Sequence, residues 1–387
     1  MAVTSPAPFT DAEVTLPALR ARTSAKWREF DPDVLPAWVA EMDFPLAPPI
    51  ADALHTAITH SDTGYAWPEP VAHSLSAYAA RHYAWSLNPS RVLVVADVMT
   101  GVAESLRRLT EPGDGVVITT PVYPPFFTTV QQATGRRIVE VPLARDGHAW
   151  TLDLDALERA FADASTTAML LCNPHNPTGS APTPDELAAL AHLARRHGIT
   201  VISDEIHAPL AMPGHRFTPY LSIDADTGDD VALLSATKGW NLPGLKCAQL
   251  IAGSDALAEQ LRGSVPIEVQ HGAGHLGAIA AVAAYDEGQP WLNRAITTIA
   301  GNHALLADLL APLGLHHRTP AATYLAWVDL SPLNLGPDPA ATLLERGRVA
   351  VSSGIPFGAP GWVRLNLGTT PTVVREIVER MAASVTP

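Results

Sequence analysis

The chain has 387 residues, of which 47% are hydrophobic and 17% charged, and its formal net charge is −14. This length and composition are typical of a globular protein with one large and one smaller domain. The acidic balance and the lack of a basic stripe argue against a nucleic-acid or membrane partner. We expect a cytoplasmic protein with reduced Cys172 and Cys247, because no signal-peptide pattern starts the sequence and no apolar run approaches bilayer-spanning length.

The first third of the chain begins irregularly. Residues 1–30 show few periodic apolar positions and are predicted to form an arm. Residues 35–44 are dense in large apolar groups, which indicates packing against another surface. A short helix is predicted over 50–59, followed by an aromatic turn at 63–68. We expect residues 1–50 to form an N-terminal arm and part of the small domain.

A regular α/β alternation starts near residue 69. Seven short runs rich in Val, Ile and Leu are predicted strands: 92–96, 116–119, 138–141, 168–172, 200–203, 231–234 and 248–252. Their continuous apolarity predicts strands buried on both faces, as in a mostly parallel seven-stranded sheet flanked by helices. One helix is especially clear, because Thr183 and Glu186 form a capping box and Gly198 ends the segment. The sequence therefore predicts a doubly wound large domain over residues 51–275.

The pattern changes in the last third of the chain. A long helical stretch is predicted over 276–310, and the later predicted elements are a strand at 324–330, a helix at 340–347, a strand at 362–367 and a final helix from residue 372. A Gly/Pro-rich segment, 354–361, separates two of them. We expect a smaller α+β domain over 276–387.

A lysine stands at the end of one predicted strand. Lys238 follows the run 231–234, and no carboxylate lies between residues 234 and 253 to pair with it. Lys246 follows eight residues later. A partly buried lysine near another positive charge has a lowered pKa, which suits it to form a Schiff base. A single loop lysine is nevertheless most simply explained as a solvated side chain.

Other polar residues follow the remaining predicted strands. They are Thr100 in the turn 97–101, Tyr123, Asn176, Asp204 and His207. Each alone is explained by a cap, a turn or an ordinary helix start. In a doubly wound sheet, however, the carboxyl ends of the strands meet where ligands bind. Together these residues supply what pyridoxal phosphate needs: a lysine, a carboxylate for the ring nitrogen, donors for the ring oxygen, an aromatic ring and a phosphate cradle.

Three motifs carry a resemblance to a known family. They are Asn-Pro-His-Asn-Pro-Thr-Gly at 173–179, Ser-Asp-Glu-Ile-His at 203–207, and Ser-Ala-Thr-Lys followed by Leu-Pro-Gly-Leu-Lys-Cys within 235–247. Over essentially its whole length the chain resembles the class I/II aminotransferase-fold enzymes that use pyridoxal phosphate (fold type I). Within this fold it is most similar to the MalY/PatB-type cystathionine β-lyases, through Ser24-Ala25-Lys26-Trp27, residues 35–44 and His207.

The resemblance implies roles for the cofactor-binding residues. Lys238 would bind the cofactor covalently, and Asp204 would pair with its ring nitrogen. The remaining cofactor-binding residues implied are Asn176 and His207 at the ring oxygen, Tyr123 stacked on the ring, Ser235, and the amides of Val98 and Met99 with Lys246 at the phosphate.

Substrate and subunit contacts are also implied. Arg364 would bind the substrate α-carboxylate, a task that suits its planar fork, and Ala40 would lie at the substrate. Tyr65 would reach the phosphate of the neighbouring subunit, so the active unit is expected to be a homodimer with shared sites.

Two segments depart from the family pattern. In the turn 97–101, the residues before Gly101 (Asp97 to Thr100) lack the usual serine and glycine, so phosphate contacts would come mainly from the backbone. His271 and His275 lie where a more asparagine-containing segment is expected. Their spacing fits two metal ligands on one helix, but the glycines between them and the lack of a third ligand argue against a metal site.

The function implied is β-elimination by a C–S lyase. Lys238 would take the Cα proton of cystathionine or another S-substituted L-cysteine, giving a thiol, pyruvate and ammonia. An aminotransferase shares the early steps and is the main alternative. Two others are a non-catalytic regulator or binding protein on the same fold, and a specialised lyase acting on a cysteine conjugate in a biosynthetic pathway.

Overall fold

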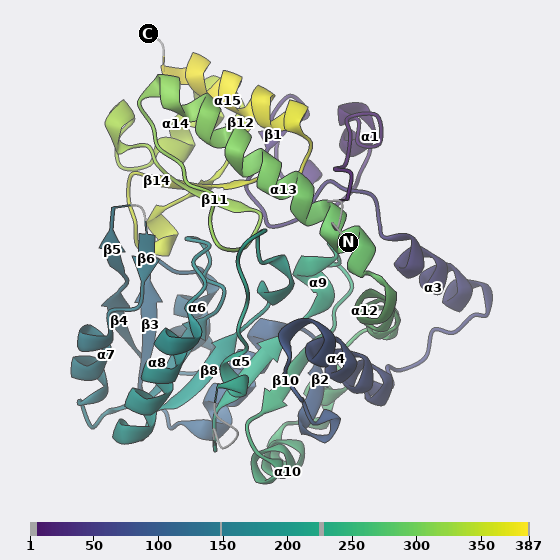
Figure 1. Cartoon of the computed structure of the whole chain (residues 1–387), viewed down its shortest axis with the longest axis vertical. Coiled ribbons are helices and arrows are strands. Elements are labelled where there is room, and N and C mark those ends of the chain that lie inside the picture. The colour runs from purple at the N-terminus through teal and green to yellow at the C-terminus, as the bar shows by residue number, and fades with distance from the viewer. Residues whose placement is uncertain (1–5, 148, 224–227, 386–387) are drawn as a thin grey trace.

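A seven-stranded sheet forms the centre of the protein (Figure 1). The computed structural model describes residues 6–147, 149–223 and 228–385. The strand order is β2-β10-β9-β8-β7-β3-β4, and β10 alone runs antiparallel to its neighbours. The strands are β2 (Val92–Val95), β3 (Gly115–Thr120), β4 (Arg137–Pro142), β7 (Thr166–Cys172), β8 (Thr200–Asp204), β9 (Val231–Leu234) and β10 (Ala248–Ala252). The seven predicted strands and the mostly parallel sheet are confirmed.

Both faces of this sheet are covered, which explains the continuous apolar runs. On β2, Val94 packs into one apolar cluster, while its neighbours Leu93 and Val95 pack into another on the opposite face. Alternate residues of a strand point to opposite faces, so a strand between two helical layers needs apolar side chains throughout.

The helices of this large unit are α3 (Pro48–Thr59), α4 (Pro68–Tyr83), α5 (Val98–Leu109), α6 (Pro125–Thr128), α7 (Leu154–Phe161), α8 (Pro184–His197), α9 (Ala236–Gly239), α10 (Asp255–Ser264), α11 (Ile267–Gln270) and α12 (His275–Glu287).

Helix α8 has the predicted ends. The Thr183 hydroxyl accepts from the Glu186 amide, and the Glu186 carboxylate accepts from the Thr183 amide. Gly198 closes the helix with a φ of +69°, a left-handed conformation that costs glycine little.

A smaller unit lies above the sheet in Figure 1, in light green and yellow. Its antiparallel sheet has the order β11-β14-β13, and a separate pair joins β1 to β12. Its elements are β1 (Leu35–Pro36), α13 (Gln289–Leu310), β11 (Leu325–Asp329), α14 (Pro339–Gly347), β12 (Val349–Ala350), β13 (Ser352–Ser353), β14 (Trp362–Asn366) and α15 (Pro371–Val385). The N-terminal arm contains α1 (Leu16–Arg20) and α2 (Ala25–Arg28) before it joins this unit through β1.

The helical stretch predicted over 276–310 consists of two helices, α12 and α13, which meet at Gly288. Pro290 lies in the first turn of α13, where its missing N–H is tolerated. Gly288 also makes room for Trp240, whose indole Nε1 donates to the Gly288 carbonyl at 2.9 Å. A Cβ on Gly288 would lie only 2.3 Å from that nitrogen.

One helix differs from the expectation that no apolar run approaches bilayer-spanning length. Among the described residues, Gln289–Leu313 is long and apolar enough, by length and composition, to cross a membrane. Asn302 and His303 on it are fully buried, and the Asn302 side chain donates to the carbonyls of Leu367 and Thr369 at 3.0 and 2.7 Å. These bonds tie the buried face of α13 to the small unit.

Candidate active site

Lys238 lies just beyond the carboxyl end of β9. Ser235 caps the short helix α9 by accepting from the Thr237 amide at 3.2 Å, and its hydroxyl donates to the Cys247 carbonyl at 2.7 Å. The Lys238 Nζ donates to the carbonyl of Ala40 at 2.9 Å. Burial, and then the charge of Arg364, lower the pKa of Lys238 to about 8. A larger share of this amine is therefore neutral near pH 7 than in an ordinary lysine.

Asp204 ends β8, the strand next to β9. Its Oδ1 accepts from the Ile206 amide at 3.1 Å, and the residue is buried. Burial raises the pKa of Asp204 to about 7, while the hydrogen bond from the Ile206 amide and the charge of Lys238 act to lower it. A buried carboxylate with this environment favours a cationic partner.

Asn176 and His207 follow the neighbouring strands β7 and β8. Asn176 is buried, and its Oδ1 accepts from the Arg364 guanidinium at 3.1 Å. His207 is also buried, and in the described part of the chain its Nδ1 has no hydrogen-bond partner. Burial, followed by the charges of Lys238 and Arg364, lowers the pKa of His207 to about 3. His207 is therefore a neutral ring with free hydrogen-bonding capacity.

Arg364 comes from β14 of the small unit. Its Nη2 donates to the Trp38 carbonyl at 3.1 Å, and its Cζ lies 5.0 Å from the centre of the Phe357 ring. The side chain is buried, and no carboxylate among the described residues pairs with it. Burial lowers the pKa of Arg364 to about 10, and its Nε has no partner within the described chain. A buried, unpaired guanidinium is suited to bind a carboxylate.

The backbone of residues 38–42 runs between Lys238 and Arg364 and offers a carbonyl to each. Asn366, two residues after Arg364, donates to the carbonyls of residues 39 and 41 at 2.7 and 2.6 Å. Asn241, three residues after Lys238, exchanges two hydrogen bonds with the backbone of residue 42. The backbone of residues 38–42 therefore fixes the side chains of Lys238 and Arg364 relative to each other.

The start of α5 lies where a phosphate was predicted. Asp97 caps the helix by accepting from the Thr100 amide at 2.8 Å, and its Oδ2 lies 3.0 Å from the Lys246 Nζ. Because α5 begins at Val98, the amides of Val98 and Met99 have no acceptor within the helix. Free amides and a lysine together form an anion site. The carboxylate partner of Lys246, Asp97, lies 149 positions away in the sequence.

The two predicted tyrosines have different positions. Tyr123 follows β3 and is partly buried; burial raises its pKa, and the charge of Arg364 acts on it in the opposite direction. Tyr65 is 89% exposed, and its ring lies 6.2 Å from that of His271. Within one chain, Tyr65 therefore stays apart from the buried group around Lys238.

His271 and His275 do not share a helix. His271 follows α11, and His275 begins α12, where its Nε2 lies 3.0 Å from the Asp62 Oδ1. The described residues contain no group of three or more His, Cys, Asp or Glu side chains arranged to hold a metal ion.

The residues present fit pyridoxal phosphate. The buried Asp204 carboxylate suits a protonated ring nitrogen, and the free Nδ1 of His207 suits a polar ring substituent. Lys238 supplies an amine of lowered pKa, and the start of α5 supplies donors for a phosphate. Asp204 and Lys238 come from the carboxyl ends of the adjacent strands β8 and β9, and α5 starts after β2, which β10 separates from β9. The carboxyl ends of the strands are the usual place for a ligand in an open α/β sheet.

Comparison with known proteins identifies the family. The pattern of aminotransferase class I and II matches residues 49–381, so the chain belongs to this family. A Mycobacterium leprae protein with the provisional name cystathionine beta-lyase is 46% identical over 95% of this chain and 96% of its own. Cystathionine beta-lyase PatB of Bacillus subtilis is 33% identical over 91% of this chain and 92% of its own.

A solved structure agrees with these relatives. It is a provisionally assigned PLP-dependent beta-cystathionase of Corynebacterium diphtheriae, 32% identical, with a TM-score of 0.90. The match covers 96% of this chain and 98% of that one. The predicted fold and the pyridoxal phosphate cofactor are confirmed by the family and by this neighbour.

The sequence reasoning missed three contributors to the site. Tyr324 donates its hydroxyl to the Ala40 carbonyl at 3.0 Å, next to Lys238. Ser352 accepts from Arg364 at 3.2 Å, and Phe357 lies beneath the same guanidinium. None of them stands in a motif. The one available signal was position, since each lies in or beside a strand of the unit that carries Arg364.

Proposed function

We propose that this protein is a pyridoxal phosphate-dependent C–S β-lyase that cleaves cystathionine or other S-substituted L-cysteines. The products are pyruvate, ammonia and a thiol. The comparisons confirm the C–S lyase class, since relatives that match most of the chain are named cystathionine beta-lyase. The observation that carries the proposal is a buried amine, Lys238, and a buried unpaired guanidinium, Arg364, held by one backbone segment.

Arg364 determines how the substrate is oriented. Its guanidinium faces Asn176 and has no carboxylate partner in the described chain, so it would receive the α-carboxylate of an amino acid. A charge-assisted bond in a buried site is directional and strong. The Cα–H bond would then be presented to Lys238 at a fixed position, which is the main contribution of binding to rate.

Lys238 acts as the base. When bound, pyridoxal phosphate supplies an aldehyde that captures the substrate amine and a ring that accepts electrons from Cα. With a pKa of about 8, the Lys238 Nζ can take the Cα proton and return one near neutral pH. Asp204 would pair with the ring nitrogen, and Asn176 and His207 would hold the ring oxygen.

The overall reaction is balanced by one water molecule. The Cα–H and Cβ–S bonds break, the sulfur leaves with the bonding electron pair and a proton, and water adds to the three-carbon remainder. Pyruvate and ammonia result, with no external oxidant or acceptor. An aminotransferase instead needs a second, keto-acid substrate, which gives a clear experimental distinction.

Several further assignments belong to this proposal. Val98, Met99 and Lys246 would bind the cofactor phosphate, Tyr123 would stack on its ring, and Ser235 shapes the turn that presents Lys238. The boundaries 1–50, 51–275 and 276–387 are proposed as the domain division, and the cytoplasm as the location.

A homodimer with shared sites is also proposed. Tyr65 and Trp67 are 89% and 66% exposed, and Ile267, in helix α11, is 55% exposed. Large apolar side chains that remain exposed are typical of protein–protein interfaces. In the dimer, Tyr65 of one chain would reach the phosphate bound by the other.

A substrate panel tests the proposed function. The purified protein with its cofactor is incubated with L-cystathionine, S-methyl-L-cysteine and L-alanine, and pyruvate and thiol are measured. The sulfur compounds should release pyruvate and thiol together, while L-alanine, which has no β leaving group, should release neither. If no S-substituted cysteine yields pyruvate, the proposed lyase activity is wrong.

A further inference from the structure

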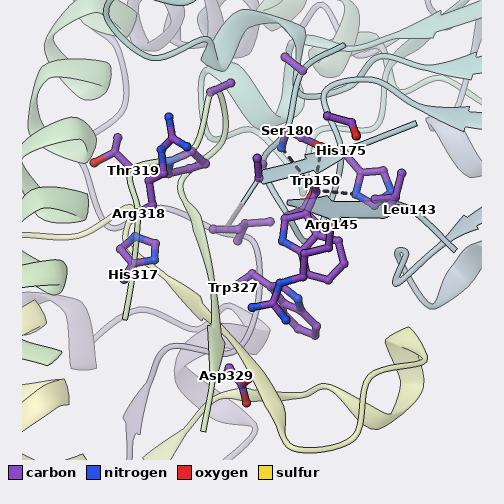
Figure 2. A pocket seen from close by; sticks show the side chains of 18 of the residues that line it. Leu143, Arg145, Trp150, His175, Ser180, His317, Arg318, Thr319, Trp327 and Asp329 are labelled. Carbon is purple, nitrogen blue, oxygen red and sulfur yellow. Dashed lines mark hydrogen bonds between the residues drawn. The ribbon is translucent and has the colours of Figure 1, made fainter. Parts of the chain in front are cut away.

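A cavity of about 490 Å³ lies between the large and small units (Figure 2). It is lined by the hairpin β5 (Ala144–Asp146) and β6 (Ala149–Thr151), parts of the loop 175–183, the segment 314–321, and strands β11 and β14. Lys238, Asp204, Asn176 and Arg364 are not among the described residues that line it. The cavity therefore adjoins the proposed catalytic site without including these four residues: His175 precedes Asn176, and Trp327 pairs with Arg364 in the sheet.

Tryptophan rings form one wall of this cavity. Trp327 and Trp362 stack with centroids 5.4 Å apart and planes 20° apart. Trp150 meets Trp362 edge-on at 5.8 Å. The Arg145 guanidinium carbon lies 5.3 Å from the Trp150 ring and 5.0 Å from the Trp362 ring. Flat apolar faces beside a cation suit a flat ligand with a negative group.

The wall carries two cations, Arg145 and Arg318, and two carboxylates, Glu186 and Asp329. Neither Arg145 nor Arg318 has a carboxylate partner among the described residues, and Arg145 Nε donates only to the Gly147 carbonyl, at 2.9 Å. The two acidic residues of the wall are already bonded locally. The Glu186 Oε2 accepts from the Thr183 amide at 2.7 Å, and the Asp329 Oδ1 accepts from the amide and hydroxyl of Ser331.

The cavity wall also contains a buried hydrogen-bond donor without a partner. Trp327 is 7% exposed, and within the described chain its Nε1 has no hydrogen-bond partner. A buried donor without a partner costs free energy that a bound acceptor recovers. Together with the two guanidinium groups, this nitrogen gives the cavity an excess of donors.

The opposite wall is held in place by its own bonds. His317 stacks on His303, with ring centroids 5.2 Å apart, and the two rings share a 2.9 Å hydrogen bond. His303 also contacts the Thr323 carbonyl at 3.2 Å. On the large unit, His175 is fixed by the Thr119 carbonyl at 3.1 Å and the Thr178 hydroxyl at 3.1 Å. The cavity is thus largely formed before any ligand enters, as is usual for small-molecule sites.

We propose that this interdomain cavity binds a small aromatic carboxylate. The ring of the ligand packs against the tryptophan wall, and its carboxylate is bound by Arg145 and Arg318. The site is independent of the lyase proposal, because it shares no lining residue with the group around Lys238 in the described chain.

A titration tests this assignment. The protein with its cofactor is titrated with indole-3-acetate by calorimetry, and separately with tryptamine, which has the same ring but a positive charge. Indole-3-acetate should bind at one site per chain with a Kd below about 1 mM, and tryptamine at least about tenfold more weakly. No saturable binding of indole-3-acetate below about 10 mM, or equal binding of the two probes, overturns the proposal.

Matched variants locate the bound probe. Arg145→Gln combined with Arg318→Gln should weaken indole-3-acetate by at least about tenfold. Arg137→Gln serves as the control, because Arg137 is an exposed arginine of β4 that bonds to Ser165 and does not line the cavity. It should leave binding unchanged. Arg364→Lys should also bind the probe normally. Unchanged binding in the double variant, or loss of binding in Arg364→Lys alone, would place the probe elsewhere and contradict the assignment.

Discussion

The guanidinium of Arg364 donates to the side-chain oxygen of Asn176 at 3.1 Å, which joins the small-unit strand β14 to the loop that follows β7. Both residues are buried, and Arg364 has no carboxylate partner among the described residues. The bond orients the guanidinium in the chain before substrate arrives. It also connects the residue proposed to bind the substrate with a residue proposed to bind the cofactor.

Replacing Arg364 by Lys should raise KM strongly. Lysine keeps the charge but cannot form the two-pronged contact with a carboxylate. Loss of this buried charged contact should cost roughly 2–5 kcal/mol in binding. Steady-state kinetics with a free S-substituted cysteine and with its methyl ester checks the reason. The ester should be a poor substrate for the original protein and be barely affected by the substitution; equal processing of acid and ester would rule out the carboxylate contact.

Asp204→Asn should retain the cofactor but lose most activity. An amide cannot supply the negative charge that keeps a ring nitrogen protonated, and losing such an electrostatic partner costs on the order of 100-fold in rate. Single-turnover pyruvate release measures the loss. Glu205→Gln is a matched control, because burial raises the pKa of the neighbouring Glu205 to about 8 and it is largely neutral at pH 7. A near-normal rate for Asp204→Asn would show that Asp204 is structural.

The capture of pyridoxal phosphate by the cofactor-free protein should depend on pH in a specific way. Since burial and Arg364 lower the pKa of Lys238 to about 8, the neutral amine increases as pH rises and is nearly complete above that value. The rate should therefore rise about tenfold per pH unit below the pKa and level off above it. Absorbance during loading measures this, with a free lysine derivative as the control. A rate that keeps rising through pH 10 would contradict the lowered pKa.

Mixed dimers test the shared site. Tyr65→Phe and Lys238→Ala should each be strongly impaired, because one removes the contact across the interface and the other removes the base. Their defects should fall in different sites of a hybrid dimer, which leaves one site intact. Mixing the two should therefore restore part of the activity after subunit exchange. Exchange without any recovery would contradict the shared site.

The large unit could be predicted from sequence because its signals are local. A strand covered on both faces must be apolar throughout, so each of the seven runs was visible without a structure. The residues at their carboxyl ends, such as Asn176 and Asp204, could then be grouped through the rules of parallel sheets. The capping box at Thr183 was equally local.

Contacts between distant segments could not be predicted in this way. Tyr324 reaches the Ala40 carbonyl across 284 positions, and no periodicity encodes that meeting. Lys246 pairs with Asp97, which lies 149 positions away in the sequence. The indole of Trp240 donates to the Gly288 carbonyl from another element. Tertiary packing decided each of these features.

The measurement closest to the central claim is the stoichiometry of products from L-cystathionine without any keto acid. The protein with its cofactor is mixed with substrate, and pyruvate, ammonia and free thiol are followed over many turnovers. The account predicts equal amounts of all three from the start, with no increase when a keto-acid acceptor is added. Product formation that depends on the acceptor, with no free thiol, would contradict it and identify an aminotransferase.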